Sequence, residues 1–198
     1  MNFLYVLLFV VTAIEVNARS YYFKSYEVED GLSNNNVTCC VQDHYGFMWF
    51  GTRDGLNRFD GNKFHIIKNQ TKQKETLISS WITDLAISPS GELWVGTDMG
   101  VQKYDYQTDT FSLVKFTKGI SCTYLDFDHQ GNLWMLLSGF SLIKYNEQSE
   151  LHQNYLYKES DPITSFYITP KDQVWVTTRN GNVALLDPTD DKFIPLIT

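Results

Sequence analysis

The stretch HYGFMWFGTRDGLNRFDG, residues 44–61, decides the fold of this chain. Its apolar run, Phe47 to Phe50, is too short and too rich in β-forming residues for a helix, and a glycine on each side marks a turn. A second short run, Leu56 to Phe59, follows after a polar turn, which predicts a β-hairpin. One hairpin cannot bury Trp49 and its large apolar neighbours alone, so further sheets must pack beside it.

The same pattern returns three times along the chain. Its tryptophans stand 45, 40 and 41 residues apart, and each lies in a short apolar run that follows a turn. Apolar residues or cysteines recur twelve and nine positions before each tryptophan, and a glycine recurs five or six positions after it. A period of this length with several short strands per unit is typical of a β-propeller blade. The tryptophans expected to fill the space between blades are Trp49, Trp94, Trp134 and Trp175.

The predicted fold is therefore all-β: a β-propeller of four consecutive four-stranded blades in an incomplete, open ring. A solenoid or a β-sandwich with coincidental spacing would also use short strands and glycine turns, but solenoid repeats of this length are normally helical. Within residues 19–198, the blade repeats are predicted at about residues 31–70, 77–117, 119–157 and 161–198.

The leading segment indicates that the ring is incomplete. Residues 21–28 are predicted as a strand before the first blade, of the kind that propellers often donate to their last blade. Each repeat already has its own outer strand, so the leading strand would belong to a later blade that is missing. A closed four-bladed ring is the alternative. The outer strands are predicted at 63–67, 110–116, 151–155 and 193–198.

The N-terminus predicts export. Phe3 to Ile14 is an apolar run of twelve residues, and a small-residue cleavage site ends at Ala18. Such a run is too short to span a bilayer. We interpret residues 1–18 as a signal peptide, with a buried N-terminal strand as the alternative.

Composition and motifs favour a binding protein over an enzyme. The chain is 43% hydrophobic and 15% aromatic, which suits a packed core, and its net charge of −7 disfavours nucleic acid as a partner. It has three cysteines, an odd number that predicts no disulfide framework. His44 and His129 share a position in turns of non-adjacent blades, so no metal site is expected there. No cofactor-binding motif and no catalytic constellation can be assembled, and we predict no enzymatic activity for these residues.

Residues 29–64, EDGLSNNNVTCCVQDHYGFMWFGTRDGLNRFDGNKF, resemble the first repeat of the two-component regulator propeller family. Its members have a Gly-Leu-Ser element, an Asp-x-x-Gly turn, a Leu-Trp-x-Gly-Thr strand and a Gly-Leu-x-x-aromatic-Asp strand. The first two repeats match closely, and the resemblance extends over about residues 21–198. The third repeat has Leu136-Leu137 in place of Gly-Thr, and the fourth has Asp172 and Thr177 in place of two glycines.

The resemblance implies the periplasmic sensor of a hybrid two-component system, which detects carbohydrate and signals through a membrane helix to a histidine kinase. No kinase motif can be read in these residues, so the chain is expected to perform the sensing alone. The implied partners are an oligosaccharide and the remaining blades and kinase of a full-length sensor, and a homodimer is left open. A secreted, non-signalling interaction or lyase-type propeller is the alternative.

A ligand is expected at one rim of the propeller, where turns between second and third strands meet the connectors between blades. Trp81 stands there in a position occupied by Asn36, Ser121 and Pro162 in the other repeats. An aromatic side chain with nearby polar groups suits a sugar ring; the alternative is that Trp81 packs on the connector at residues 61–80. The predicted rim residues are Trp81, Arg53, Asp54, Asp98, Arg179 and Asn180.

Overall fold

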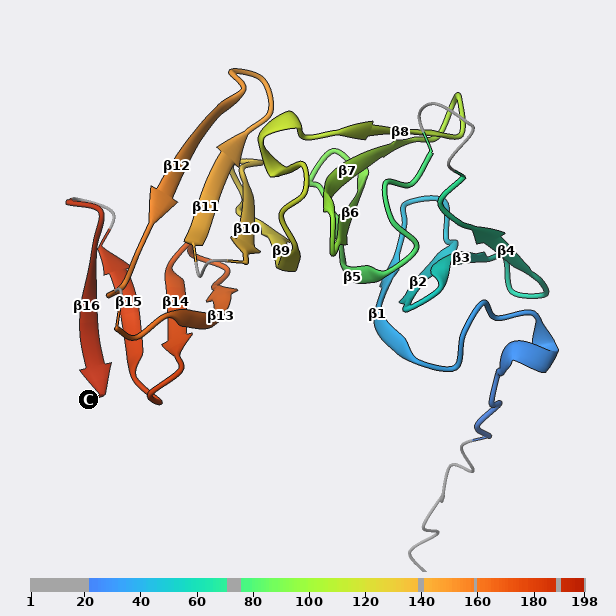
Figure 1. The fold of residues 1–198 in the computed structure, drawn as a ribbon, viewed down its shortest axis with the longest axis horizontal. Helices are drawn as coiled ribbons and strands as arrows, with labels where there is room; N and C mark the ends of the chain where they lie inside the picture. Colours follow the sequence, from blue (N-terminus) through green and yellow to red (C-terminus); the bar gives the residue numbers. More distant parts are fainter. Residues whose placement is uncertain (1–21, 71–75, 139–140, 159, 188–189, 198) are drawn as a thin grey trace, which may run out of the picture.

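The computed structural model describes residues 22–70, 76–138, 141–158, 160–187 and 190–197, and the predicted signal peptide lies outside them. The described residues form sixteen strands in four antiparallel sheets, and each sheet contains four consecutive strands. We call these sheets blades 1 to 4. They stand side by side in an arc, with blade 1 on the right and blade 4 on the left in Figure 1.

The strands of each blade run in sequence order from the inner to the outer edge. Blade 1 comprises β1 (Val37–Gln42), β2 (Met48–Thr52), β3 (Gly55–Phe59) and β4 (Phe64–Ile67). Blade 2 comprises β5 (Ile82–Ile87), β6 (Leu93–Thr97), β7 (Gly100–Asp105) and β8 (Thr110–Leu113). Blade 3 comprises β9 (Cys122–Phe127), β10 (Leu133–Leu137), β11 (Ser141–Asn146) and β12 (Leu151–Tyr155). Blade 4 comprises β13 (Ile163–Ile168), β14 (Val174–Thr178), β15 (Val183–Asp187) and β16 (Lys192–Ile197).

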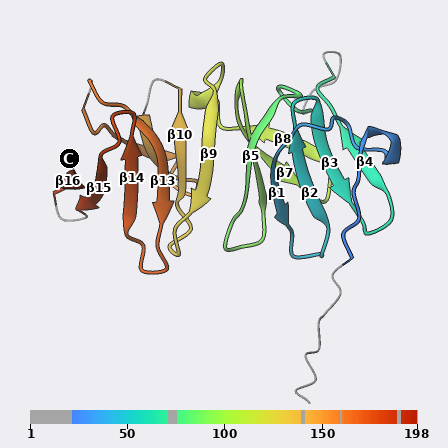
Figure 2. The same ribbon diagram turned by 90° about the horizontal axis from the view of Figure 1, so that it is seen from below.

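The predicted fold class is confirmed, including the open ring. The inner strands β1, β5, β9 and β13 contact one another in that order, and Figure 2 shows them along one side of the row. Blades 1 and 4 lie at opposite ends of the arc (Figure 1). Helix is confined, in the part of the chain that the structure describes, to two three-residue 3-10 turns, η1 (Val28–Asp30) and η2 (Lys115–Thr117).

Each buried tryptophan packs against the following blade. Trp49 shares a core cluster with Leu93 and Val95 of blade 2, and Trp134 shares one with Val176 of blade 4. The exposed fractions are 0% for Trp49, 2% for Trp94 and 3% for Trp134. Trp175 is only half-buried. Trp175 is therefore less completely buried than the other three tryptophans, because the described residues place no blade beyond blade 4.

In blades 1 and 3 the turn before the second strand also holds the tryptophan. In blade 1, the Asp43 carboxylate accepts hydrogen bonds from the backbone N–H groups of Tyr45 and Phe47, and a third from the Trp49 indole at 2.7 Å. Asp128 accepts the equivalent indole bond from Trp134 at 3.0 Å. The Asp of the Asp-x-x-Gly turn thus caps the turn and also fixes the orientation of the buried ring.

Two predicted strands differ in the structure. β8 ends at Leu113 rather than at residue 116, because the Thr117 hydroxyl, within η2, accepts a hydrogen bond from Val101 N–H at 2.9 Å and directs the chain toward blade 3. The leading segment, where described at 22–27, forms no strand. Instead Tyr26 packs edge-on against Phe59 and Phe64, on a face of blade 1 and not along a strand edge.

Candidate functional site

The predicted rim is formed by regular hydrogen bonds between turns and connectors. The residue that follows the second strand of a blade donates its backbone N–H to the residue that precedes the inner strand of the same blade. This bond joins Asp98 to the Trp81 carbonyl at 3.3 Å and Arg179 to the Pro162 carbonyl at 3.0 Å. In blade 3 it joins Ser138 to Ser121 at 2.7 Å. The rim is therefore a property of the fold and not of one loop.

Trp81 and Arg53 meet at this rim across the boundary between blades 1 and 2. The Arg53 guanidinium lies 5.1 Å from the centre of the Trp81 ring, a cation–π distance. The Trp81 side chain nevertheless keeps 42% of its surface exposed. It therefore presents an aromatic face to solvent, beside a positive charge.

The two acidic residues predicted for this rim differ in their partners. Asp54 forms an ion pair with Lys68 at 2.6 Å, and both side chains are about half exposed, so this pair contributes little to stability. Asp98 has one carboxylate oxygen, Oδ1, that is buried and finds no hydrogen-bond partner among the described residues. A buried acceptor without a donor is costly. Asp98 is therefore the acidic residue of this rim whose carboxylate is left without a protein donor on one oxygen.

Arg179 and Asn180 lie apart from this group, in the β14–β15 turn of blade 4. Buried Asp161 holds that turn: it accepts hydrogen bonds from Asn180 N–H at 2.9 Å and from the Thr178 hydroxyl at 2.6 Å. Burial opposes ionisation of Asp161, but these bonds lower the pKa of its carboxyl below the usual value. Blade 3 stands between this turn and Trp81, so the structure leaves Arg179 and Asn180 apart from Arg53, Asp54, Trp81 and Asp98.

A half-buried carboxyl on an inner strand was missed by the sequence analysis. Asp84 lies on β5, and its Oδ2 accepts a hydrogen bond of 2.7 Å from the Leu125 N–H on β9, which links blades 2 and 3. Burial raises the pKa of Asp84 to about 6, and the nearby Asp126 carboxyl adds to this rise. The signal in the sequence was an acidic residue inside an otherwise apolar strand.

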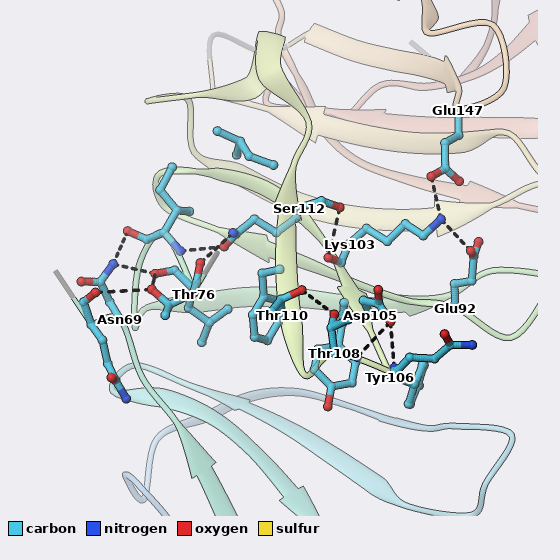
Figure 3. A pocket seen from close by; sticks show the side chains of 18 of the residues that line it. Asn69, Thr76, Glu92, Lys103, Asp105, Tyr106, Thr108, Thr110, Ser112 and Glu147 are labelled. Carbon is cyan, nitrogen blue, oxygen red and sulfur yellow. Dashed lines mark hydrogen bonds and ion pairs between the residues drawn. The ribbon is translucent and has the colours of Figure 1, made fainter. Parts of the chain in front are cut away.

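A hollow of about 1270 Å³ lies over the outer part of blade 2 (Figure 3). It is an open concavity whose charged side chains bind one another: Lys103 lies 2.6 Å from Glu92 and 2.7 Å from Glu147 of blade 3. Desolvation opposes both charges, but the ion pairs raise the pKa of Lys103 and lower the pKa of Glu92. We interpret these ion pairs as a link between blades 2 and 3 rather than as a binding site, because the charges of Lys103, Glu92 and Glu147 compensate one another.

The two turn histidines do not come together. His44 Nδ1 lies 2.9 Å from the Gly91 carbonyl, and His129 Nδ1 lies 2.9 Å from the Asp172 carboxylate. Each histidine thus contacts the corresponding turn of the next blade. Within the ranges that the structure describes, no three histidine, cysteine, aspartate or glutamate side chains gather as metal ligands do. The three cysteines are free thiols.

These features define the class: an open β-propeller with an aromatic and polar rim. Residues 31–54 match the family model described as two component regulator propeller. The resemblance noted in the sequence is thereby confirmed. No helix in the described part of the chain is both long and apolar enough to cross a membrane.

Comparison with known proteins agrees with this assignment. Over 74 residues the chain is 42% identical to a histidine kinase of Formosa agariphila, a match that covers 36% of this chain and 5% of the kinase. The structure is similar to the extracellular domain of a hybrid two component system from B. thetaiotaomicron, with a TM-score of 0.54 and 19% identity over 86% of this chain and 31% of that domain. A virginiamycin B lyase from Staphylococcus aureus has a TM-score of 0.64 at 10% identity, over 80% of this chain and 54% of the lyase. The chain thus spans a small part of the kinase and about a third of the extracellular domain.

Proposed function

We propose that this chain is a ligand-sensing segment of an exported sensor and that it recognises carbohydrate at the rim formed by Arg53, Trp81 and Asp98. The observation that carries the proposal is the exposed Trp81 ring, held by Arg53 on a rim where the backbone of Asp98 bonds to that of Trp81. The family match and the fold shared with an extracellular domain of a hybrid two component system support a sensing role.

The chemistry of the three side chains suits a sugar. The flat Trp81 ring offers an apolar surface for the C–H face of a pyranose, and the Arg53 contact limits the movement of the indole. The half-buried Asp98 carboxylate can accept from a hydroxyl, and the Arg53 guanidinium can donate to one. Such a combination of an aromatic platform with a few polar groups is common in ligand sites.

The signal would pass to a histidine kinase that lies outside these residues, with the sensing part in the periplasm. No catalytic role is proposed for this segment. The likeness to a lyase rests on 10% identity and concerns the fold alone.

A glycan array screened with the purified chain tests the rim. We expect Trp81→Ala to weaken binding of any oligosaccharide that the array identifies by about tenfold or more, as for a central aromatic contact. Calorimetry measures the loss, and circular dichroism checks that the variant is folded. Because Trp81 is 42% exposed, the fold should tolerate the change.

Tyr45→Ala is the matched control. Tyr45 is another exposed aromatic residue, 62% exposed, but it lies in the β1–β2 turn and lines the outer hollow of blade 2. If Tyr45→Ala abolishes binding and Trp81→Ala does not, the ligand binds at the hollow and the rim proposal is wrong.

A further inference from the structure

The connector that ends at Trp81 is fixed to the fold a few residues before the tryptophan. Leu77 is 0% exposed and belongs to the core cluster between blades 1 and 2, together with Trp49 and Leu93. The backbone on either side of Leu77 therefore lies against the sheets, where its polar groups need hydrogen-bond partners. Two side-chain amides supply them, those of Gln102 and Asn69.

Gln102 lies within β7 and is only 3% exposed. Its amide oxygen accepts a hydrogen bond of 2.6 Å from the Ile78 N–H, and its amide nitrogen donates one of 3.0 Å to the Thr76 carbonyl. The two bonds use both ends of the amide and hold the backbone on both sides of Leu77. A buried amide whose oxygen and nitrogen are both paired holds its partners in one arrangement.

Asn69 holds the same segment a second time. Its amide nitrogen donates to the carbonyls of Leu77 at 2.6 Å and Ile78 at 2.9 Å, and its backbone N–H donates to the Ser80 hydroxyl at 2.9 Å. Figure 3 shows Asn69 and Thr76 close together at one end of the hollow. The connector is thus held at several successive residues before it reaches the rim.

The restraint continues to Trp81 itself. The Trp81 N–H donates to the Ser79 hydroxyl at 3.1 Å, and the Trp81 carbonyl accepts the 3.3 Å bond from Asp98. The exposed indole, by contrast, has the Arg53 guanidinium as its ring contact. The direction in which the ring stands out from the rim therefore depends on the backbone that carries it.

The other blades show that the fold does not need an amide at this position. The residues that occupy it, each paired with the residue after the repeated tryptophan, are Asn57, Gln102, Ile143 and Ala184. Both Ile143 and Ala184 are buried apolar residues. In blade 1, Asn57 accepts a 2.8 Å bond from the Ser33 N–H, four residues before β1, just as Ile78 stands four residues before β5. The amide therefore anchors a connector in blades 1 and 2, and in blade 2 that connector ends at an aromatic residue.

We propose that Gln102 is a positioning residue of the rim site: it anchors the connector so that the Trp81 ring already has its binding orientation before a ligand arrives. Gln102 touches no ligand and acts through residues 76–81. A side chain that is ordered in advance loses less conformational entropy on binding, and the affinity is higher for that reason. The effect on affinity rests on the proposed function, whereas the orientation of Trp81 can be measured without a ligand.

Fluorine NMR of the chain labelled with 5-fluorotryptophan tests the positioning role. The Trp81 resonance is the one that disappears in Trp81→Phe. Gln102→Met keeps the length of the side chain and removes both hydrogen bonds, and it should fold, because blades 3 and 4 have apolar residues at this position. We expect the Trp81 line to broaden or split in Gln102→Met. An unchanged line in the folded variant would overturn the proposal.

Asn132→Leu is the matched control. Asn132 is another buried amide, 8% exposed, but it bonds to the Asp128 carboxylate in the turn before β10, at the end of blade 3 away from the rim. This variant should lower the urea midpoint and leave the Trp81 line unchanged. Equal changes of that line in both variants would reflect a general loss of stability, and the positioning role would be wrong.

Asn69→Leu keeps the test decisive if Gln102→Met does not fold. Asn69 is half-buried, so its replacement is milder, and it removes the bonds to the carbonyls of Leu77 and Ile78. The Trp81 line should broaden in this variant as well. A sharp line at the original position would show that the connector does not set the orientation of the ring.

Calorimetry then separates this inference from the proposed function. For an oligosaccharide that the glycan array identifies, Gln102→Met should raise the Kd about tenfold, which corresponds to ordering one free side chain on binding. Asn132→Leu should leave the Kd unchanged. An unchanged Kd in Gln102→Met would overturn the positioning role even if the Trp81 line broadens. If no oligosaccharide binds the chain, the proposed function fails, and the fluorine spectra alone decide whether Gln102 orients Trp81.

Discussion

Replacing Trp94 by alanine will lower the free energy of unfolding by about 3–5 kcal/mol, the range for removal of a large core aromatic side chain. Trp94 is 2% exposed and lies in one cluster with Leu125 and Met135 of blade 3, so its removal opens a cavity between two blades. Its indole N–H has no hydrogen-bond partner among the described residues. The loss therefore reports packing together with the cation–π contact of Lys103, and no hydrogen bond of the indole. Urea unfolding followed by far-ultraviolet circular dichroism measures it.

Trp81→Ala makes the same chemical change at an exposed site and serves as the comparison. With 42% of its surface exposed and one cation–π contact, Trp81 should contribute less than about 1 kcal/mol. Equal costs for Trp81 and Trp94 would show that the repeated tryptophans do not fill the space between blades.

The repeat made the fold predictable. Because every blade buries its faces against its neighbours, the same large side chain recurs at the same place, and the spacing of Trp49, Trp94 and Trp134 located three blades in the sequence. The half-buried Trp175 has the same place in the repeat but no following blade in the described structure. A periodic pattern identifies equivalent positions, whereas burial also depends on what lies on the other side.

The candidate site was predictable only in part. The sequence placed Arg53, Trp81 and Arg179 on one rim, but the distance along the rim depends on the number of blades between two turns, so Arg179 proved remote from Trp81. The unpaired oxygen of Asp98 is a property of packing that no single-residue pattern contains. The same is true of Asp84, whose hydrogen bond to Leu125 joins residues 41 positions apart.

The stability of the chain will fall as the pH rises from about 4.5 to 6.5. Asp84 has an ordinary pKa of 3.8 and a folded-state pKa of about 6, so between these values the folded chain binds more protons than the unfolded chain. The stabilisation is fully present below the ordinary pKa and is lost as the pH rises through about 6. The difference between these two pKa values of Asp84 corresponds to about 3 kcal/mol of unfolding free energy when the pH is above both of them.

The physical cause is the position of Asp84 between the inner strands of blades 2 and 3. Burial disfavours its charged form, and the Asp126 carboxyl disfavours it further, although the backbone N–H groups of Leu85 and Leu125 oppose the effect. The cysteines near Asp84 supply no compensating charge, because burial also raises the pKa of the Cys39 and Cys122 thiols. Burial likewise raises the pKa of Asp126, so its contribution has the same sign.

Asp84→Asn should remove most of this slope. Asparagine keeps the size of the side chain and one acceptor oxygen, but it has no charge in the pH range of the experiment. The carboxyls with lowered pKa values, among them Glu92 and Asp172, act in the opposite direction, but their stabilisation is lost only as the pH falls below their ordinary pKa values of 4.5 and 3.8. Between pH 4.5 and 6.5 the change in stability therefore reports Asp84 and not these two carboxyls. Urea midpoints of both proteins measured across this pH range decide the matter: parallel curves would show that Asp84 is already ionised in the folded chain at the lower pH.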